Sequence, residues 1–287
     1  MAGQPRVDPS ASVGGDLAAG NGPALVPLFR WPGGKRWLLP KLLELIPDQY
    51  GRYFEPFFGA GALFFGLAPS DAVVSDVNVD LMACYLAIRD SHVMVAALLR
   101  AMERDRAAYL EIRESNPIDK CERAARFIYL STLAFNGIHR VNKRGLFNVP
   151  YGGRTYPGLG SDELLGKYSR ALAHAEIRSG DFESSVGSAA TGDVVYLDPP
   201  YTVAHSNNGF LKYNARIFSW NDQLRLAAVA DDLHRRGCRV IISNASHPSL
   251  IPLYPNFHVE VVPRLSRMAA ASAKRGLVDE YLLTNDS

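Results

Sequence analysis

Short apolar segments that end in acidic residues or glycines recur along the chain. Four of them, rich in β-branched and aromatic residues, are 53–55, 72–76, 194–198 and 239–243. Runs of this kind are typical of strands buried on both faces of a parallel sheet. Two further segments near the C-terminus, 257–262 and 278–284, are expected to pair as a hairpin-like unit across a long basic loop.

Helical patterns lie between some of these strands. The clearest are 35–46 and 221–236, and Gly237 follows the second, as expected for a helix that ends on a left-handed residue. Strands that alternate with helices predict an α/β fold with a doubly wound, mostly parallel sheet.

The alternation is interrupted in the middle of the chain, where helical stretches dominate at 80–89, 94–114 and 122–135. We therefore predict an inserted helical subdomain, 81–174, within a catalytic domain formed by 27–80 and 175–287. Inside the insertion, a basic hairpin over 136–151 would turn at Lys143-Arg144-Gly145, where glycine allows a positive φ. Residues 1–26, rich in Gly, Ala, Pro and Ser, are expected to be disordered.

The distribution of charge adds to this picture. The whole chain carries a formal charge of +2, but segment 120–178 holds ten Lys and Arg against four acidic residues, and 264–275 adds four more basic residues without an acid. The remainder of the chain is therefore acidic. A locally basic insertion suits a polyanionic partner, because phosphate contacts supply most non-specific affinity. A solvated basic face is the simpler alternative.

Cysteine usage and hydropathy limit the class of protein. Cys84, Cys121 and Cys238 are far apart and form no Cys-x-x-Cys pair, so neither a disulfide framework nor a zinc site is expected, and each should be a small buried residue. No apolar run approaches the roughly 20 residues needed to cross a bilayer, and no signal segment begins the chain. We expect a cytoplasmic protein without membrane association and without a metal.

The strongest candidate for chemistry is the tetrapeptide Asp198-Pro199-Pro200-Tyr201, directly after an apolar strand. Ligands of α/β sheets bind outside the carboxyl ends of strands. Two prolines fix the backbone and remove two N–H donors, so that carbonyls stay free to accept. An exocyclic aromatic amine is a poor nucleophile because its lone pair is delocalised. Asp198 and the Pro199 carbonyl could each accept one amine hydrogen and localise that pair, with Tyr201 stacked on the base. A rigid turn is the alternative.

A glycine-containing segment, Phe57-Phe58-Gly59-Ala60-Gly61, follows the first strand and would allow a ligand to approach the backbone closely. The dinucleotide pattern Gly-x-Gly-x-x-Gly would need a further glycine where Phe64 stands, so a nicotinamide cofactor is disfavoured. Asp76, at the end of the next strand, is placed to accept hydrogen bonds from ribose hydroxyls, or is an ordinary acidic strand terminus.

Another candidate is Trp31-Pro32-Gly33-Gly34-Lys35, at the start of the first helical pattern. The full phosphate-loop spacing is missing, which argues against an ATPase. Lys35 could instead bind the carboxylate of an amino-acid moiety, and Trp31 could pack against a cation.

Together with two segments of the insertion, 135–140 and 145–152, these motifs resemble the Dam-type (alpha group) DNA adenine N6-methyltransferases from about Phe29 to Leu283. The resemblance implies the fold of S-adenosylmethionine-dependent methyltransferases and a target-recognition insertion. It also implies that S-adenosylmethionine is bound by residues of the motifs above and by two residues after the insertion: Trp31, Lys35, Phe57, Gly59, Gly61, Asp76, Asp181, Phe182 and Asp198.

By the same resemblance, the chain methylates N6 of an adenine flipped out of duplex DNA, with Asp198, Pro199, Pro200 and Tyr201 as the catalytic motif. The DNA-contacting residues would be Phe135, Asn136, Arg140, Asn142, Lys143, Arg144 and Arg154. Phe135 matches an intercalating position at which tyrosine is more usual, and Arg140 matches a guanine reader. His139 and Val141 differ from the best-known members, so a GATC-like site is one candidate target.

The resemblance also bears on partners and leaves rival functions open. It suggests a monomer associated with the nucleoid, with a cognate restriction endonuclease as one candidate partner. Methylation of RNA adenine or of a protein glutamine is a rival reaction, although the latter usually goes with Asn where this chain has Asp198. A catalytically silent DNA-binding module is the rival of another class.

Overall fold

A computed structural model describes residues 25–142, 144–153, 156, 158–202, 218–265 and 277–285. The tail predicted to be disordered therefore lies almost wholly outside the described residues. The same holds for the basic residues of 264–275 other than Arg264.

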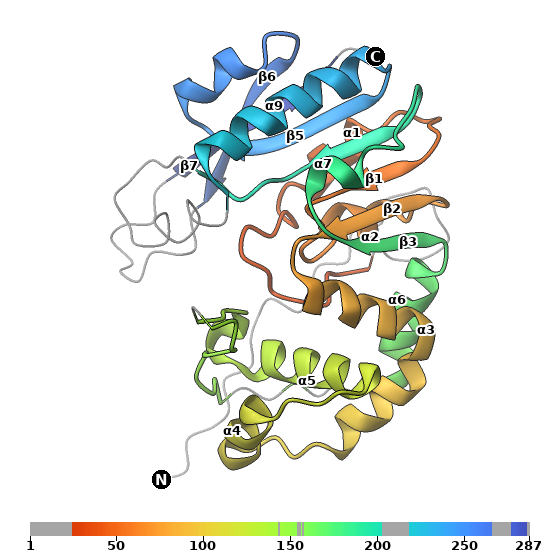
Figure 1. Cartoon of the computed structure of the whole chain (residues 1–287), viewed down its shortest axis with the longest axis vertical. Helices are drawn as coiled ribbons and strands as arrows, with labels where there is room; N and C mark the ends of the chain where they lie inside the picture. The colour runs from red at the N-terminus through yellow and green to blue at the C-terminus, as the bar shows by residue number, and fades with distance from the viewer. Residues whose placement is uncertain are drawn as a thin grey trace.

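The described strands form one seven-stranded sheet in the order β3-β2-β1-β4-β5-β7-β6. The pairs from β3 to β5 are parallel, and β7 runs antiparallel to both β5 and β6 (Figure 1). The prediction of a mostly parallel sheet with a terminal hairpin-like pair is confirmed. The strands are β1 Tyr53–Glu55, β2 Ala72–Asp76, β3 Ala175–Ser179, β4 Val194–Leu197, β5 Arg239–Ala245, β6 His258–Leu265 and β7 Leu277–Thr284.

Helices cover both faces of the sheet, as a doubly wound fold requires. Tyr53 and Tyr196 point into a core shared with α1, α2, α3, α5 and α6, whereas Phe54 and Val195 point into a second core under α7 and α9. The helices are α1 Leu39–Glu44, α2 Ala62–Leu67, α3 Val79–Ala101, α4 Arg106–Glu114, α5 Lys120–Leu133, α6 Asp162–Leu172, α7 Phe182–Ser185 and α9 Trp220–Arg235, with 3-10 turns η2 Phe135–Gly137 and η3 Pro248–Leu253.

Helix α9 matches the sequence prediction because both of its ends carry strong local signals. Ser219 and Asp222 form a capping box at its start, and Gly237 adopts φ 79° just after its end. The first predicted helix is shorter than expected: α1 begins only at Leu39, with Pro40 in its first turn. Residues before it form turns, and Gly33 has φ 80°. Lys35 thus precedes the helix instead of opening it.

The prediction of a single helix over 94–114 is wrong. Helix α3 ends at Ala101, and α4 starts anew after Asp105, whose side chain accepts a hydrogen bond from the Ala108 N–H at 2.9 Å. Asp105 caps the start of a new helix, and this local signal outweighs the helical pattern of apolar residues that runs from 94 to 114.

The segment between β2 and β3 is helical, as expected, but it does not have a core of its own. Figure 1 shows α4 and α5 on the far side of α3 and α6 from the sheet. Phe127 of α5 and Tyr85 of α3 belong to the same buried cluster as Tyr53 and Tyr196 of the sheet. The division into a catalytic domain and an inserted subdomain at 81–174 therefore stays a prediction.

Helix α3 corrects the hydropathy prediction. By length and composition, Val79–Ala101 is apolar enough to cross a membrane, contrary to the expectation from the sequence. However, its buried side chains, such as Leu81, Tyr85 and Leu99, belong to the main core, and its backbone is kinked at Ser91. We assign α3 as a core helix.

The three cysteines are buried free thiols, as predicted. Burial raises the pKa of the Cys84 thiol well above its ordinary value, so it stays protonated and acts as a small apolar side chain within the main core.

The turn before β4 is fastened to the start of β1 by one buried carboxylate. Asp193 Oδ1 accepts a hydrogen bond from the Arg52 N–H at 2.7 Å, and Oδ2 accepts one from the Ala190 N–H at 2.8 Å. The Asp193 side chain is 7% exposed, so its two oxygens are occupied by these backbone donors and have little contact with water.

Replacing Asp193 with Ala should lower the free energy of unfolding by about 1–3 kcal/mol, because two hydrogen bonds from the backbone to a buried charged acceptor are lost. Chemical denaturation measures the loss. The control is Asp71→Ala, which removes an exposed ion pair with Arg52 at 3.0 Å and should cost less than about 1 kcal/mol. Equal losses in the two variants would contradict this assignment.

Candidate active site

Polar side chains gather where the central strands end. Glu55 and Asp76 are the last residues of β1 and β2, and Asp198 directly follows β4. Ser243 and Glu280 lie on β5 and β7, which are paired with each other. Parallel strands end at the same edge of a sheet, so residues distant in sequence meet here.

Lys35 lies at the centre of this group. Its Nζ is 2.9 Å from Asp198 Oδ1 and 3.7 Å from Glu280 Oε2, and it donates to the Gly33 carbonyl at 2.9 Å. The Lys35 side chain is 3% exposed. Its charge thus faces two protein carboxylates, so the prediction that it binds a ligand carboxylate stays without structural support.

Two cations and two anions alternate through the site. Glu280, buried like Lys35, also pairs with Arg264, whose Nη1 is 2.7 Å from Oε1. The series Asp198, Lys35, Glu280, Arg264 is therefore neutral as a whole, which buried charges require. From the sequence, Glu280 and Arg264 were recognised only as parts of a strand and a basic loop.

Asp198 receives a second hydrogen bond from the neighbouring strand. The Ser243 hydroxyl donates to Oδ1 at 2.7 Å, and the Tyr196 hydroxyl lies 2.9 Å from Ser243 Oγ. Burial raises the pKa of Asp198, whereas Lys35 and Ser243 act against that rise. Asp198 keeps 18% exposure, in contrast to 3% for Lys35 and Glu280.

The other residues of the tetrapeptide lie close to Lys35 and Asp198. Lys35 Nζ lies over the Tyr201 ring at 4.9 Å from its centroid. The Tyr201 hydroxyl is buried and makes no hydrogen bond with any part of the chain that the structure describes. Pro199 is buried and Pro200 half-buried.

Glu55 is a buried carboxyl that the sequence analysis identified only as the end of the strand 53–55. The Tyr53 hydroxyl donates to its Oε2 at 2.8 Å. Burial, together with the nearby Asp198, raises the pKa of Glu55 to about 8, so the group is mostly neutral at pH 7. A neutral Glu55 lets Asp198 ionise without repulsion from a charge on Glu55.

Three residues predicted to bind the cofactor lie together between β1 and β2. Asp76 Oδ2 accepts from the Gly59 N–H and Oδ1 from the Asn78 N–H, each at 2.9 Å. Gly59 has φ 48°, and a Cβ there would lie 2.7 Å from Cδ1 of Trp31. The position therefore needs glycine, which brings Trp31 against the loop that Asp76 fixes.

A second group of predicted cofactor residues lies beside the first. The rings of Phe57 and Phe182 stack with centroids 5.3 Å apart. Asp181 begins α7, accepting from the Glu183 N–H, and pairs with Arg225 at 2.7 Å. Gly61 has φ 64° and precedes α2.

The hairpin region 136–151 contacts Trp31 through the ring of His139. His139 stacks on Trp31 with centroids 5.3 Å apart, and Phe127 lies 4.9 Å from His139. Burial lowers the pKa of His139 to about 4, so the imidazole is neutral at pH 7. The stack is thus a contact between uncharged rings.

Hairpin geometry is present where the sequence predicted it. Bridges join Val141 to Phe147 and Ala134 to Tyr151, and Gly145 has φ 75° in the turn. The Asn142 side chain accepts from the backbone of Arg144 at 2.8 Å. Asn136 has φ 59°. Two predicted DNA-binding residues, Lys143 and Arg154, lie outside the described residues.

Exposed apolar and basic side chains occur together on this hairpin. Phe135 is 55% exposed and Leu146 60%. Arg140 is exposed and donates to Asn148 Oδ1 at 2.9 Å, and Arg144 is exposed at the turn. Exposed apolar side chains of this kind can insert between stacked bases, and neighbouring cations can contact the nucleic-acid backbone.

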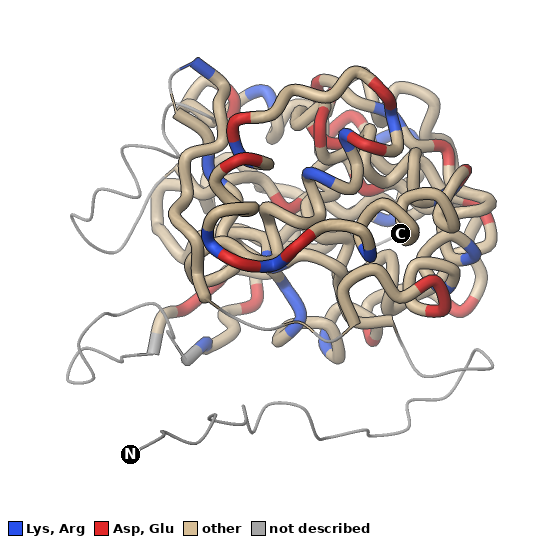
Figure 2. The backbone as a smooth tube through the Cα atoms, turned by 90° about the horizontal axis from the view of Figure 1, so that it is seen from below, with Lys and Arg blue, Asp and Glu red and all other residues tan. Residues whose placement is uncertain are grey.

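Elsewhere the excess of basic residues is partly neutralised. Figure 2 shows Lys and Arg interspersed with Asp and Glu over much of the backbone. Arg123 pairs with Asp80 at 2.8 Å, and Lys167 pairs with Glu163 at 2.9 Å. Asp80 lies outside the counted segment 120–178, so the charge count overstates how basic the region around Arg123 is.

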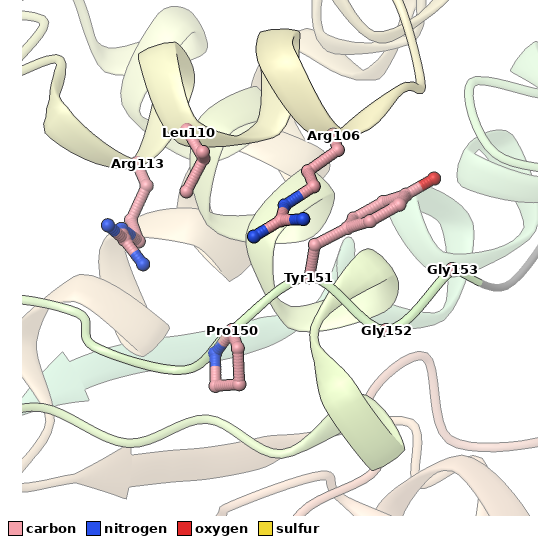
Figure 3. A pocket seen from close by; sticks show the side chains of 7 residues that line it. All are labelled: Arg106, Leu110, Arg113, Pro150, Tyr151, Gly152 and Gly153. Atoms are coloured by element: carbon pink, nitrogen blue, oxygen red, sulfur yellow. The ribbon is translucent and has the colours of Figure 1, made fainter.

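A basic cavity of about 420 Å³ lies at the base of the hairpin (Figure 3). Arg106 and Arg113 extend from α4 on one side, and residues 150–153 form the other side. These arginines are seven residues apart, so they share one helix face. They were not identified from the sequence because they lie outside the basic segment 120–178.

Comparison with known proteins agrees with this arrangement. The model of the D12 class N6 adenine-specific DNA methyltransferases matches residues 31–268. A Type II methyltransferase of Lactococcus lactis subsp. cremoris is 40% identical, over 91% of this chain and 95% of its own length. A Type II methyltransferase of Methanocaldococcus jannaschii is 30% identical, over 90% and 98%. The DNA adenine methylase of Escherichia coli is 31% identical, over 88% and 93%.

The family match covers the tetrapeptide, the glycine-containing loop and the hairpin together, and the similarity to relatives extends over most of each chain. It favours DNA adenine over the RNA, glutamine and silent-reader alternatives. The chain belongs to the D12 class of N6 adenine-specific DNA methyltransferases.

Proposed function

We propose that Asp198, Pro199 and Tyr201 hold an adenine flipped out of duplex DNA and activate its N6. The observation that carries the proposal is the placement of a partly exposed carboxylate at the end of β4 next to the buried charges of Lys35 and Glu280. Asp198 and the Pro199 carbonyl would each accept one N6 hydrogen, which directs the nitrogen lone pair away from the ring. Pro200 would keep the turn rigid, and Tyr201 would stack on the base.

S-adenosylmethionine, the cofactor that the family implies, supplies an electrophilic methyl group when bound. The chain offers groups that fit it. Asp76 retains a free lone pair on each oxygen for ribose hydroxyls, and the stacked Phe57 and Phe182 offer aromatic surface near Asp181. Gly59 and Gly61 would allow close approach to the backbone. Trp31 would lie along the same loop.

For Lys35, the contacts favour a different role from the one first expected. Its ammonium is 2.9 Å from Asp198 and is 3% exposed. We therefore assign it to holding Asp198 ionised, and any contact with the cofactor carboxylate would come in addition.

DNA would approach the hairpin. Phe135 would enter the base stack beside Asn136, Arg140 would read a guanine, and Asn142, Lys143, Arg144 and Arg154 would contact the duplex. The exposure of Phe135 and Arg140 supports this. The basic cavity with Arg106 and Arg113 would hold flanking phosphates, since guanidinium groups match phosphate oxygens.

The target and partners follow from the relatives. A GATC-like site is our candidate target, and two relatives named as Type II methyltransferases support a cognate restriction endonuclease as a partner. We propose that the enzyme acts as a monomer on the nucleoid in the cytoplasm. Sequencing that detects N6-methyladenine in DNA from expressing cells would identify the flanking bases.

Replacing Asp198 with Asn should reduce methyl transfer by at least roughly 100-fold, because the amide is uncharged and has an NH₂ donor where the carboxylate has its second acceptor oxygen. Counting N6-methyladenine in plasmid DNA by mass spectrometry measures this. Thermal unfolding checks that the variant is folded. A folded variant with near-normal turnover would overturn the catalytic assignment.

Replacing Arg106 and Arg113 together with Gln should weaken duplex binding and flatten its dependence on salt. The slope should change by about 0.9 for each phosphate that the variant no longer neutralises. Fluorescence anisotropy at several salt concentrations gives both the affinity and the slope. The control is Arg235→Gln, on exposed α9, which should leave the slope unchanged. An unchanged slope in the double variant would exclude binding of phosphates by these two arginines.

A further inference from the structure

Three hydroxyl and carboxyl groups are aligned across two neighbouring strands. Tyr196 lies on β4, two residues before Asp198, so the two side chains are on the same face of the strand. Strand β5 pairs in parallel with β4, with Leu197 opposite Ile242. One step further along, Ser243 lies beside Asp198.

The direction of the hydrogen bonds in this group follows from proton counting. An ionised Asp198 can only accept, so Ser243 must donate its single hydroxyl proton to Oδ1, at 2.7 Å. Ser243 Oγ must then act as the acceptor in its 2.9 Å contact with Tyr196. Burial raises the pKa of Tyr196 well above its ordinary value, which keeps that phenol protonated and able to donate.

The two donors to Asp198 reach the same oxygen. Lys35 Nζ and Ser243 Oγ both contact Oδ1, at 2.9 and 2.7 Å. Over the described part of the chain, no donor reaches Oδ2. Among the described residues, Oδ1 therefore carries both contacts that anchor the carboxylate, and Oδ2 carries none.

We propose that Ser243, oriented by Tyr196, is a positioning residue for methyl transfer: it holds Asp198 so that Oδ2 points to the adenine amine. Ser243 does not touch the base and keeps its proton throughout, so it acts only through Asp198. The proposal rests on the proposed role of Asp198 as the acceptor for N6. Neither Ser243 nor Tyr196 was identified from the sequence.

Ser243→Ala removes the hydroxyl and little else. We expect kcat to fall roughly 10- to 100-fold, the effect of one missing hydrogen bond to a charged group, with KM for cofactor and DNA within about twofold. The matched control is Ser75→Ala. Ser75 is also a fully buried strand serine, but its hydroxyl bonds to no described group, so turnover should not change.

The pH profile separates positioning from a merely structural role. Activity requires ionised Asp198 and so falls as pH drops through its pKa. Removal of the Ser243 hydrogen bond raises that pKa further, so the acid limb of kcat should move to higher pH. Lys35, Glu280, Glu55, Tyr196 and Tyr201 also face Asp198, and they stay in place in the variant.

Tyr196→Phe provides a second test, because it leaves Ser243 able to donate but without its orienting partner. We expect turnover to fall about two- to fivefold. The double variant should be no slower than Ser243→Ala, since Tyr196 acts only through Ser243. Multiplying losses in the double variant would contradict the proposed order.

Asp198→Asn, assayed in parallel, separates the proposed function from the role of Ser243. An active Asp198→Asn would remove the proposed function itself. An inactive Asp198→Asn with fully active Ser243→Ala would remove only the role of Ser243. If Ser243→Ala is unfolded by thermal melting, the acid limb of Tyr196→Phe decides: a shift to higher pH supports the proposal and an unmoved limb overturns it.

Discussion

The site depends on the buried ion pair between Lys35 and Asp198. A carboxylate at this depth would otherwise take up a proton, since burial raises its pKa. Lys35 opposes that rise, Glu280 and Arg264 complete a neutral series, and Glu55 remains largely uncharged. The arrangement keeps the partly exposed Asp198 negatively charged and balances the charge of the more deeply buried Glu280.

The sheet makes this arrangement possible. Lys35 comes from the turn before α1, Asp198 from the end of β4, and Glu280 from the antiparallel β7. Inserting β7 between β5 and β6 places Glu280 within reach of residues more than two hundred positions earlier. The order of the strands therefore determines which charged residues meet at the site.

Local sequence carried much of this information. Continuous apolar runs predicted β1, β2, β4 and β5, and the tetrapeptide after β4 marked the site. Strand β3 was not predicted as such, because Glu176 and Arg178 interrupt its apolar pattern at the edge of the sheet. The roles of Ser243 and Glu280 could not be predicted, because they depend on register between strands, which no short pattern encodes.

The stack of His139 on Trp31 joins the hairpin, to which we assign DNA, and the loop region to which we assign the cofactor. His139 directly precedes Arg140 on the hairpin, whereas Trp31 contacts the loop held by Asp76. Any ring that replaces the imidazole must also fill the space against the tryptophan. If the hairpin reads the target, as proposed, a substitution at 139 that changes the target must also keep the packing against Trp31 and Phe127.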